Sequence, residues 1–311
     1  MKIVILDAYT TIKDDLNFDN IKTSGELIVY SRTSPNEVDE RIKDAEIVVT
    51  NKTPITKKTI ENAKNLKMIS VLATGYNVVD VASAKATGIT VCNAPNYSTQ
   101  SVSQLVFAYI LNIYNKVHEH NDWIKSGAWS NSSDFSYTLG TVHELASKTI
   151  GIVGYGQIGK RVKLIAESFG MRVLFTCRSD VPGKTDLRTL LKESDIVTLH
   201  CSLNETTRYL INKETLSYMK SESILINTAR GDVVSENDVI DALNKNKIAY
   251  YCADVCSKEP IERNNALLYN PHVILTPHLG WATFEARKRL VQITKENITA
   301  YLNEKPINVV G

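Results

Sequence analysis

The stretch Thr149-Ile-Gly-Ile-Val-Gly-Tyr-Gly-Gln-Ile-Gly-Lys160 decides how this 311-residue chain is expected to fold. It opens with a short run rich in β-branched residues, Thr149–Val153, which is typical of a buried strand. Three glycines follow with the spacing Gly154-x-Gly156-x-x-Gly159, and residues with helical periodicity come next. The first glycine permits a tight turn, the second lets a pyrophosphate approach the backbone, and the third lets helix and strand pack closely. Because the pattern lies between a predicted strand and a predicted helix, it predicts a dinucleotide-binding site.

Length and composition set the broad class. A chain of 311 residues with 43% apolar and 23% charged residues is typical of a globular protein with two domains. The formal net charge of +2 offers no basic surface for nucleic acid or for an acidic membrane. No apolar run reaches the length of a bilayer, and the five cysteines are odd in number and scattered. We therefore expect free thiols in a reducing cytoplasm and no metal site.

The first 98 residues are expected to alternate strands and helices in a small doubly wound α/β unit without a glycine motif of its own. The expected strands are Lys2–Leu6, Leu27–Tyr30, Glu46–Thr50, Met68–Leu72 and Thr90–Cys92, and the expected helices are Pro35–Lys43, Thr56–Ala63 and Val79–Ala86. A strongly apolar helix is predicted from Ser101 to about His118, followed by an irregular excursion over Trp123–Ala146.

Six strands are predicted from Thr149 onward, which fits a full Rossmann domain. They are Thr149–Val153, Met171–Thr176, Asp195–His200, Ser223–Asn227, Tyr250–Asp254 and His272–Thr276. Helices are expected at Lys160–Phe169, Leu187–Lys192, Lys213–Met219, Glu236–Asn244 and Ala282–Leu302.

The end of the second of these strands bears on the choice of dinucleotide. NAD-binding domains usually carry an acidic residue there to accept a hydrogen bond from the ribose 2′-hydroxyl. Here Cys177 takes that place and is followed by Arg178 and Ser179, which can hold a 2′-phosphate. The sequence therefore favours NADP(H), with NAD(H) possible if Arg178 is only a surface residue or if Asp180 replaces the acid.

Three functional side chains follow the ends of later strands, where ligands bind in open α/β sheets. They are Arg230, Glu259 and His278. A cation can bind a substrate carboxylate, an imidazole can exchange a proton with an oxygen, and a carboxylate can orient and charge that imidazole. Each of them alone is commonly a structural or surface residue, so the prediction depends on their convergence at one edge of the sheet.

With these motifs in view, the chain resembles the D-2-hydroxyacid dehydrogenases of the glycerate dehydrogenase and glyoxylate/hydroxypyruvate reductase type. The residues that carry the resemblance are Leu72–Asn77, Asn93–Thr99, the glycine motif, Leu199–Cys201, Asn227–Gly231, Asp254 with Glu259-Pro260, and Thr276–Ala282. The resemblance implies two doubly wound domains, a Rossmann coenzyme domain inserted in a smaller flavodoxin-like substrate domain. It assigns residues 1–98 and 286–311 to the substrate domain and residues 99–285 to the coenzyme domain.

The resemblance also implies roles for individual residues. Arg230, Glu259 and His278 would be catalytic, with the substrate bound by Thr74, Gly75, Arg230, His278 and Trp281. Coenzyme would be bound by Gly154, Tyr155, Gly156, Gln157, Ile158, Gly159, Cys177, Arg178, Ser179, His200, Cys201, Thr207, Thr228, Ala229, Asp254 and His278. The apolar helix and the excursion after it resemble the family's dimer interface, which predicts a homodimer.

The expected reaction is reduction of a small 2-oxoacid, such as glyoxylate or hydroxypyruvate, to the D-2-hydroxyacid with NAD(P)H. The bulk of Trp281 favours small substrates, although core packing would explain this residue equally well. Ser202 replaces a proline common in relatives, and the segment Asp180–Lys184 is short, which leaves the recognition of the 2′-phosphate open. The alternatives are a phosphite dehydrogenase and a dinucleotide-sensing interaction protein on the same fold, whereas Glu259 argues against a formate enzyme. The sequence does not rank the 2-oxoacids or give the direction of the reaction.

Overall fold

The computed structural model describes residues 1–13, 15–21 and 25–311. The chain divides into two compact units, Met1–Ser98 together with Trp281–Gly311, and Thr99–Gly280. The predicted second boundary, after residue 285, lies within helix α10 (Phe284–Leu302), whereas the compact units divide before Trp281.

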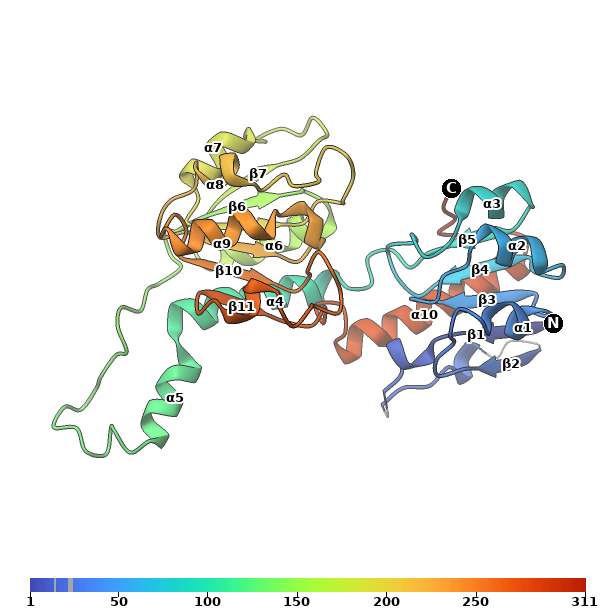
Figure 1. Ribbon diagram of the computed structural model, residues 1–311, viewed down its shortest axis with the longest axis horizontal. Coiled ribbons are helices and arrows are strands. Elements are labelled where there is room, and N and C mark those ends of the chain that lie inside the picture. The colour runs from blue at the N-terminus through green and yellow to red at the C-terminus, as the bar shows by residue number, and fades with distance from the viewer. Residues whose placement is uncertain (14, 22–24) are drawn as a thin grey trace. The chain divides into compact units, whose positions relative to one another are not determined.

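The first unit is built on a parallel sheet of five strands in the order β2-β1-β3-β4-β5 (Figure 1). This 2-1-3-4-5 order is that of flavodoxin-like folds. Residues of α10 pack on one face of the sheet, and residues of α1, α2 and α3 pack on the other. The strands are β1 (Lys2–Ile5), β2 (Glu26–Val29), β3 (Ile47–Thr50), β4 (Met68–Val71) and β5 (Thr90–Cys92). The helices are η1 (Ala8–Thr10), η2 (Asp19–Ile21), α1 (Val38–Ile42), α2 (Lys57–Asn62), α3 (Val81–Ala86) and α10.

A buried carboxylate closes the carboxyl edge of this sheet. Asp7 follows β1, is 1% exposed and accepts hydrogen bonds from the backbone amides of Asn51, Lys52 and Thr53. The three donor–acceptor distances to the nearer oxygen are 2.9, 2.6 and 2.7 Å. Convergent backbone amides form an anion-binding loop, and here the anion is a side chain of the protein itself.

The second unit contains a parallel sheet of six strands in the order β11-β10-β9-β8-β6-β7. The connections run in opposite directions from β6 and β8, so the sheet has its topological switch point between these two strands. The strands are β6 (Thr149–Val153), β7 (Arg172–Thr176), β8 (Ile196–Leu199), β9 (Ile224–Asn227), β10 (Tyr250–Ala253) and β11 (Val273–Leu275). The helices are α4 (Thr99–Asn115), α5 (Val117–Lys125), α6 (Gln157–Ser168), α7 (Leu187–Glu193), α8 (Lys213–Leu216), η3 (Gly231–Val233), α9 (Glu236–Asn244) and η4 (Ala266–Tyr269).

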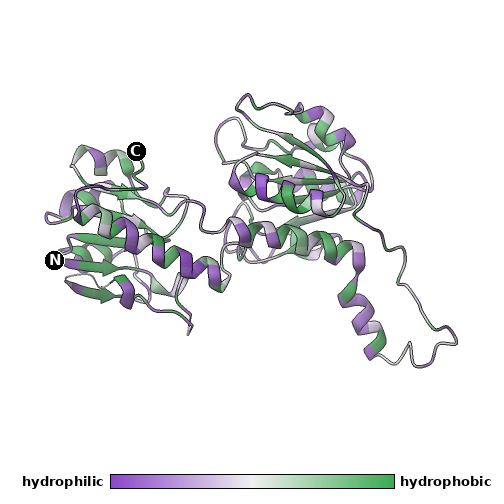
Figure 2. Cartoon of the chain, turned by 180° about the vertical axis from the view of Figure 1, so that it is seen from behind, coloured by the Kyte–Doolittle hydropathy of each residue, from purple (hydrophilic) through white to green (hydrophobic). Residues whose placement is uncertain are grey.

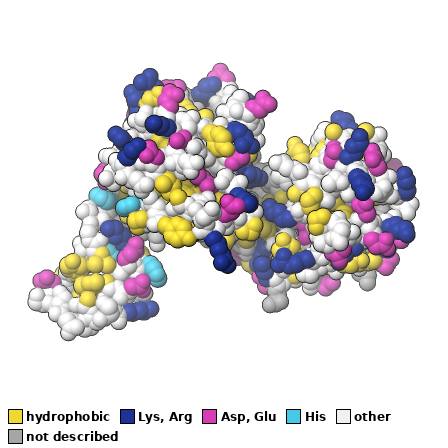
Figure 3. All heavy atoms as spheres, in the orientation of Figure 1, with side chains coloured by type: hydrophobic (Ala, Val, Ile, Leu, Met, Phe, Trp, Pro, Cys, Tyr) yellow, Lys and Arg dark blue, Asp and Glu magenta, His cyan; other side chains and the backbone are white. Residues whose placement is uncertain are grey.

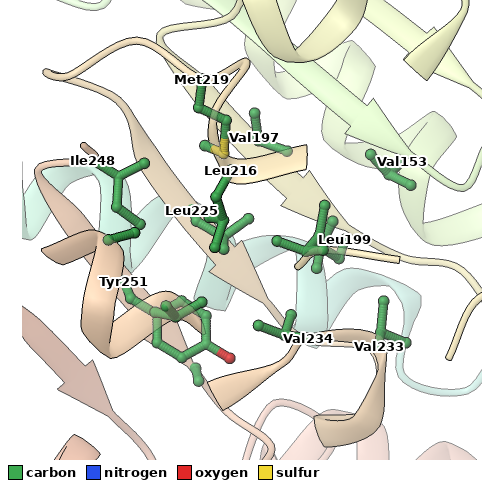
Figure 4. Packing of buried hydrophobic residues seen from close by; sticks show 14 of the residues in the cluster. Val153, Val197, Leu199, Leu216, Met219, Leu225, Val233, Val234, Ile248 and Tyr251 are labelled. Carbon is green, nitrogen blue, oxygen red and sulfur yellow. The ribbon is translucent and has the colours of Figure 1, made fainter. Parts of the chain in front are cut away.

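Apolar side chains fill both faces of this second sheet. Residues of α4 and α6 pack on one face, while residues of α7, α8 and α9 pack on the other. Figure 4 shows the second of these cores, in which Tyr251 is enclosed by aliphatic side chains. The strands of both units are coloured as hydrophobic in Figure 2, as expected for parallel strands covered on both faces. The predicted α/β class with two doubly wound units is confirmed.

The long apolar helix differs from its prediction. A single helix was expected from Ser101 to about His118, but α4 ends at Asn115 because Lys116 adopts a left-handed conformation with φ of +50°. A second helix, α5, then runs over nine residues that the sequence predicted partly as irregular chain, and none of its residues is buried. We call residues 117–144 the arm, since they extend away from the sheet of the second unit (Figure 1).

Within residues 1–13, 15–21 and 25–311, none of the helices has the length and apolar character needed to cross a membrane.

Candidate active site and coenzyme site

The three motif glycines have three different surroundings. Gly154 has φ of +101°, and a Cβ built there would lie 2.6 Å from the backbone of His200 and Cys201. A Cβ on Gly159 would lie 2.2 Å from the carbonyl oxygen of Gly154, so α6 can approach β6 only without a side chain. At Gly156 a Cβ would meet no atom within 4 Å. Packing therefore requires glycine at two positions, while the third leaves open space beside the first turn of α6.

That open space fits a pyrophosphate. Gly156 is the N-cap of α6 and provides no side-chain cap, so the first amides of the helix are available to an anion. Gln157 and Ile158 begin this helix, and Tyr155 stacks on Phe175 of β7 with ring centroids 3.9 Å apart. The residues present therefore match the needs of a dinucleotide at the switch point of the sheet.

The segment after β7 presents cations at the end expected for the ribose. Arg178 and Ser179 are exposed, and the thiol of Cys177 donates to the Ser179 carbonyl oxygen at 3.4 Å. Asp180 forms an ion pair with Lys184 at 3.0 Å. Lys184 lies on the same loop, and its charge is balanced by that of Asp180.

His200 lies between two threonine hydroxyls, and its backbone meets the glycine turn at Gly154. Its Nε2 lies 3.0 Å from the Thr198 hydroxyl and its Nδ1 lies 3.3 Å from the Thr228 hydroxyl. Burial lowers the pKa of His200 to about 3, so its imidazole is neutral at physiological pH. Next to it, burial raises the pKa of the Cys201 thiol, and Thr207 closes the following loop by donating to the Ser202 carbonyl oxygen at 2.7 Å.

The loop that carries Arg230 is shaped by Asn227, the last residue of β9. The Asn227 side chain donates to the Arg230 carbonyl oxygen at 2.9 Å and accepts from the Ala229 amide at 3.0 Å. The guanidinium of Arg230 is exposed and donates to the Ala229 carbonyl oxygen at 2.6 Å. Sequence reasoning missed this role of Asn227, although an Asn at the end of a strand is a known signal for a side-chain-closed turn.

His278 and Glu259 form a direct pair. The Nδ1 atom of His278 lies 2.6 Å from a carboxylate oxygen of Glu259, and the other oxygen accepts from the Cys256 amide at 3.1 Å. His278 has φ of +52°, a left-handed conformation that is uncommon for a side chain of this size and often marks a functional position. The pairing fixes Nδ1 as the protonated nitrogen facing the carboxylate and leaves Nε2 for another partner.

Asp254 anchors the loop that presents His278. Its carboxylate accepts from the Thr276 hydroxyl at 2.5 Å and from the amides of Leu279 and Gly280, each at 2.8 Å. Burial raises its pKa, and these hydrogen bonds oppose the rise. The hydroxyl of Tyr109, on α4, bonds in turn to Thr276. The family resemblance implied that Asp254 binds coenzyme, and the sequence did not reveal this anchoring network, whose members are up to 167 residues apart.

The remaining predicted residues lie in the first unit. Thr74 and Gly75 occupy the loop after β4, and Trp281 packs edge-on against Tyr97 with ring centroids 6.4 Å apart. Throughout the described ranges, which omit residues 14 and 22–24, no group of three or more His, Cys, Asp or Glu side chains is arranged to hold a metal.

Comparison with known proteins agrees with this geometry. Residues 107–280 match the family described as D-isomer specific 2-hydroxyacid dehydrogenase, NAD binding domain. The chain is 42% identical to a hydroxypyruvate reductase of Blautia hydrogenotrophica, with complete coverage of both proteins. It is 38% identical to a glycerate dehydrogenase of Methylorubrum extorquens, over 99% of this chain and 98% of the relative. Among solved structures, an acyclic imino acid reductase in complex with NADPH and D-Arg has a TM-score of 0.88 and 32% identity over the full length of both chains.

The chain therefore belongs to the D-2-hydroxyacid dehydrogenase family, as the resemblance predicted. It is an NAD(P)-dependent oxidoreductase, and its cofactor is a nicotinamide dinucleotide.

Proposed function

We propose that this enzyme reduces a small 2-oxoacid of the glyoxylate or hydroxypyruvate kind to the D-2-hydroxyacid, with NADPH as the preferred coenzyme. The observation that carries the proposal is the 2.6 Å contact between His278 Nδ1 and the Glu259 carboxylate, since it prepares an imidazole to deliver a proton. Relatives named hydroxypyruvate reductase and glycerate dehydrogenase support the choice of substrate.

The reduction requires one hydride at C2 of the oxoacid and one proton at its carbonyl oxygen. A bound reduced nicotinamide supplies the hydride that C2 of the oxoacid accepts. Negative charge then develops on the former carbonyl oxygen, and His278 Nε2 donates a proton to it, leaving a neutral hydroxyl. Glu259 stabilises the imidazolium before this transfer and keeps Nδ1 protonated throughout. Glu259→Gln, which removes the charge that stabilises the imidazolium, should therefore lower kcat for reduction.

Arg230 is assigned to the substrate carboxylate. A guanidinium binds a carboxylate in a bidentate manner. The guanidinium of Arg230 is exposed, and the Asn227 side chain fixes its loop by donating to the Arg230 carbonyl oxygen. In the first unit, the amides of Thr74 and Gly75 are assigned to the same carboxylate. Arg230→Ala should raise the KM for the oxoacid and leave the KM for NADPH unchanged. Arg208→Ala, which removes an ion pair with Asp232 and a contact with the Tyr209 ring, should change neither.

The preference for NADPH is supported by the loop after β7. Cys177 stands where a carboxylate would repel a 2′-phosphate, Arg178 is exposed, and Asp180 is paired with Lys184. A charge-assisted hydrogen bond contributes about 1.5–3 kcal/mol, so Arg178→Ala should weaken NADPH by about ten- to hundredfold and leave NADH nearly unchanged. Arg188→Ala, an exposed arginine stacked on Tyr218, is the matched control. Equal losses with both coenzymes would refute the assignment.

We assign to Trp281 the role of limiting the size of the substrate side chain. Its indole packs beside Tyr97 in the first unit, and its removal would open space for a longer side chain. Steady-state rates with glyoxylate, hydroxypyruvate and a branched 2-oxoacid test this. Trp281→Ala should raise kcat/KM for the branched acid relative to glyoxylate, while an unchanged ratio would make Trp281 a packing residue.

A second copy of this chain is the proposed partner, and the cytoplasm is the proposed location. The arm exposes apolar side chains that a monomer leaves in water, and Figure 3 shows hydrophobic side chains gathered on it. The exposed members are Val117, Ile124, Trp129, Phe135, Tyr137 and Val142. Sedimentation at micromolar concentration should give a dimer, and Phe135→Asp together with Ile124→Asp should weaken it. The five free cysteines suit a reducing compartment.

A further inference from the structure

The loop after β4 is held so that its amides remain free. The Thr74 carbonyl oxygen accepts from the Asn93 side chain at 2.7 Å, and the Thr74 hydroxyl donates to the Ala94 carbonyl oxygen at 3.0 Å. Among the residues that the structure describes, no acceptor is bonded to the amides of Thr74 or Gly75. The loop is therefore fixed through its carbonyl and its hydroxyl, while two neighbouring N–H groups stay available to an anion.

Asn93 is the residue that fixes it. It directly follows β5, is 9% exposed, and uses its backbone as well as its side chain. Its amide donates to the Asn308 carbonyl oxygen at 3.1 Å, and its carbonyl oxygen accepts from the Asn297 side chain at 2.8 Å. Its position is thus set by two other asparagines.

Asn297 and Asn308 complete the chain of hydrogen bonds. Asn297 is fully buried on α10, and its side-chain oxygen accepts from the Asn308 side chain at 2.8 Å. Asn308 has φ of +54° and lies in the C-terminal tail. The tail itself runs antiparallel to β5, with a bridge between Cys92 and Val309 and a hydrogen bond from the Val310 amide to the Val91 carbonyl oxygen at 2.9 Å.

We propose that Asn93, Asn297 and Asn308 are positioning residues for substrate binding, and that the C-terminal tail is part of the device that aims the Thr74 and Gly75 amides at the substrate carboxylate. This inference rests on the proposed function. A buried amide is costly to leave unpaired, so each asparagine fixes the next with little freedom. Removing a hydrogen bond of this series at Asn297 or Asn308 should loosen the loop after β4. The coenzyme motif belongs to the second unit and should keep its structure.

The first test replaces Asn297 by leucine, which has nearly the same shape and no hydrogen-bonding groups. The matched control is Thr294→Val, because Thr294 is also fully buried on α10 and its hydroxyl donates within the same helix, to the Leu290 carbonyl oxygen. Losing a hydrogen bond that holds the carboxylate-binding amides should raise the KM for glyoxylate by about three- to tenfold. The inhibition constant of oxamate, a carboxylate mimic of the substrate, should rise in parallel. The kcat and the KM for NADPH should stay within about twofold, because the lost interaction holds the substrate equally in the ground state and in the transition state.

The second variant, Asn308→Gly, keeps folding intact because glycine tolerates a positive φ and the residue is only partly buried. It should produce the same split with a smaller rise. If both variants match Thr294→Val, or if the KM for NADPH rises as much as that for glyoxylate, the positioning role is wrong. Wild-type enzyme without turnover of any 2-oxoacid would instead overturn the proposed function, and with it the ligand of this loop.

Discussion

The two sheets of this protein treat their anion-binding amides in opposite ways. At the carboxyl edge of the first sheet, the buried Asp7 side chain accepts from the amides of Asn51, Lys52 and Thr53. At the switch point of the second sheet, the turn after β6 has open space at Gly156 and no side-chain cap on α6. The first unit thus binds a carboxylate of its own, whereas the second leaves its donors to a ligand.

The largest effect is expected where the second unit carries the reacting group. His278→Ala should lower kcat by about 10²–10⁴-fold, because a positioned acid contributes that much. NADPH binding, measured by its fluorescence, should change little. His272→Ala is the control, since His272 is exposed and only packs edge-on against Tyr250. Retention of more than a tenth of the activity would show that another group delivers the proton.

Removing the built-in anion of the first unit should cost stability instead. Asp7→Asn turns a carboxylate that accepts several hydrogen bonds into an amide whose N–H₂ group faces donors, so the free energy of unfolding should fall by about 3 kcal/mol. Denaturant midpoints measure this, with the exposed Asp44→Asn as the control. The dissociation constant of NADPH should not change. A rise in the dissociation constant of NADPH without a fall in the free energy of unfolding would contradict a purely structural role for Asp7.

The glycine turn should show the reverse behaviour. Gly156→Ala adds a methyl group to empty space in the free protein, so the melting temperature should hold while the dissociation constant of NADPH rises about tenfold or more. Gly159→Ala should destabilise the fold itself, because its Cβ would meet the Gly154 carbonyl oxygen. Unchanged coenzyme binding in Gly156→Ala would mean that the open space is not the pyrophosphate site.

At neutral pH the smallest effect is expected at His200, whose contribution to stability changes only on acidification. His200 has a pKa of about 3 in the folded protein and about 6.5 when unfolded, so between these values the unfolded state binds the extra proton. Stability should therefore fall as pH drops from about 6.5 toward 3, by up to about 1.4 kcal/mol per pH unit, and should be independent of this group above that window. His200→Gln, which can still bond to both threonines, should reduce that slope. An identical slope in the variant would place the effect elsewhere.

What the sequence could predict follows from the range of the interactions. The glycine turn, the strand pattern and the non-acidic loop after β7 depend on neighbours in sequence. The pairing of His278 with Glu259 follows because both residues come after parallel strands. The break at Lys116 was missed because a left-handed lysine has no local signal. The hydrogen bonds of Asp7 join residues at least 44 positions apart, and the contact between Asn93 and Asn297 joins residues 204 positions apart. Asp and Asn side chains usually bond to water, so the sequence does not reveal these partners. Only the folded chain shows which of these side chains do not bond to water.

The central claim is hydride transfer to C2 of a small 2-oxoacid, and isotope transfer tests it most directly. Hydroxypyruvate is incubated with the enzyme and with NADPH deuterated at the transferable C4 position, and the product is analysed by mass and by chiral chromatography. We predict D-glycerate that carries the deuterium at C2. Product of the L configuration, product without deuterium, or no oxidation of NADPH with any small 2-oxoacid would contradict the account.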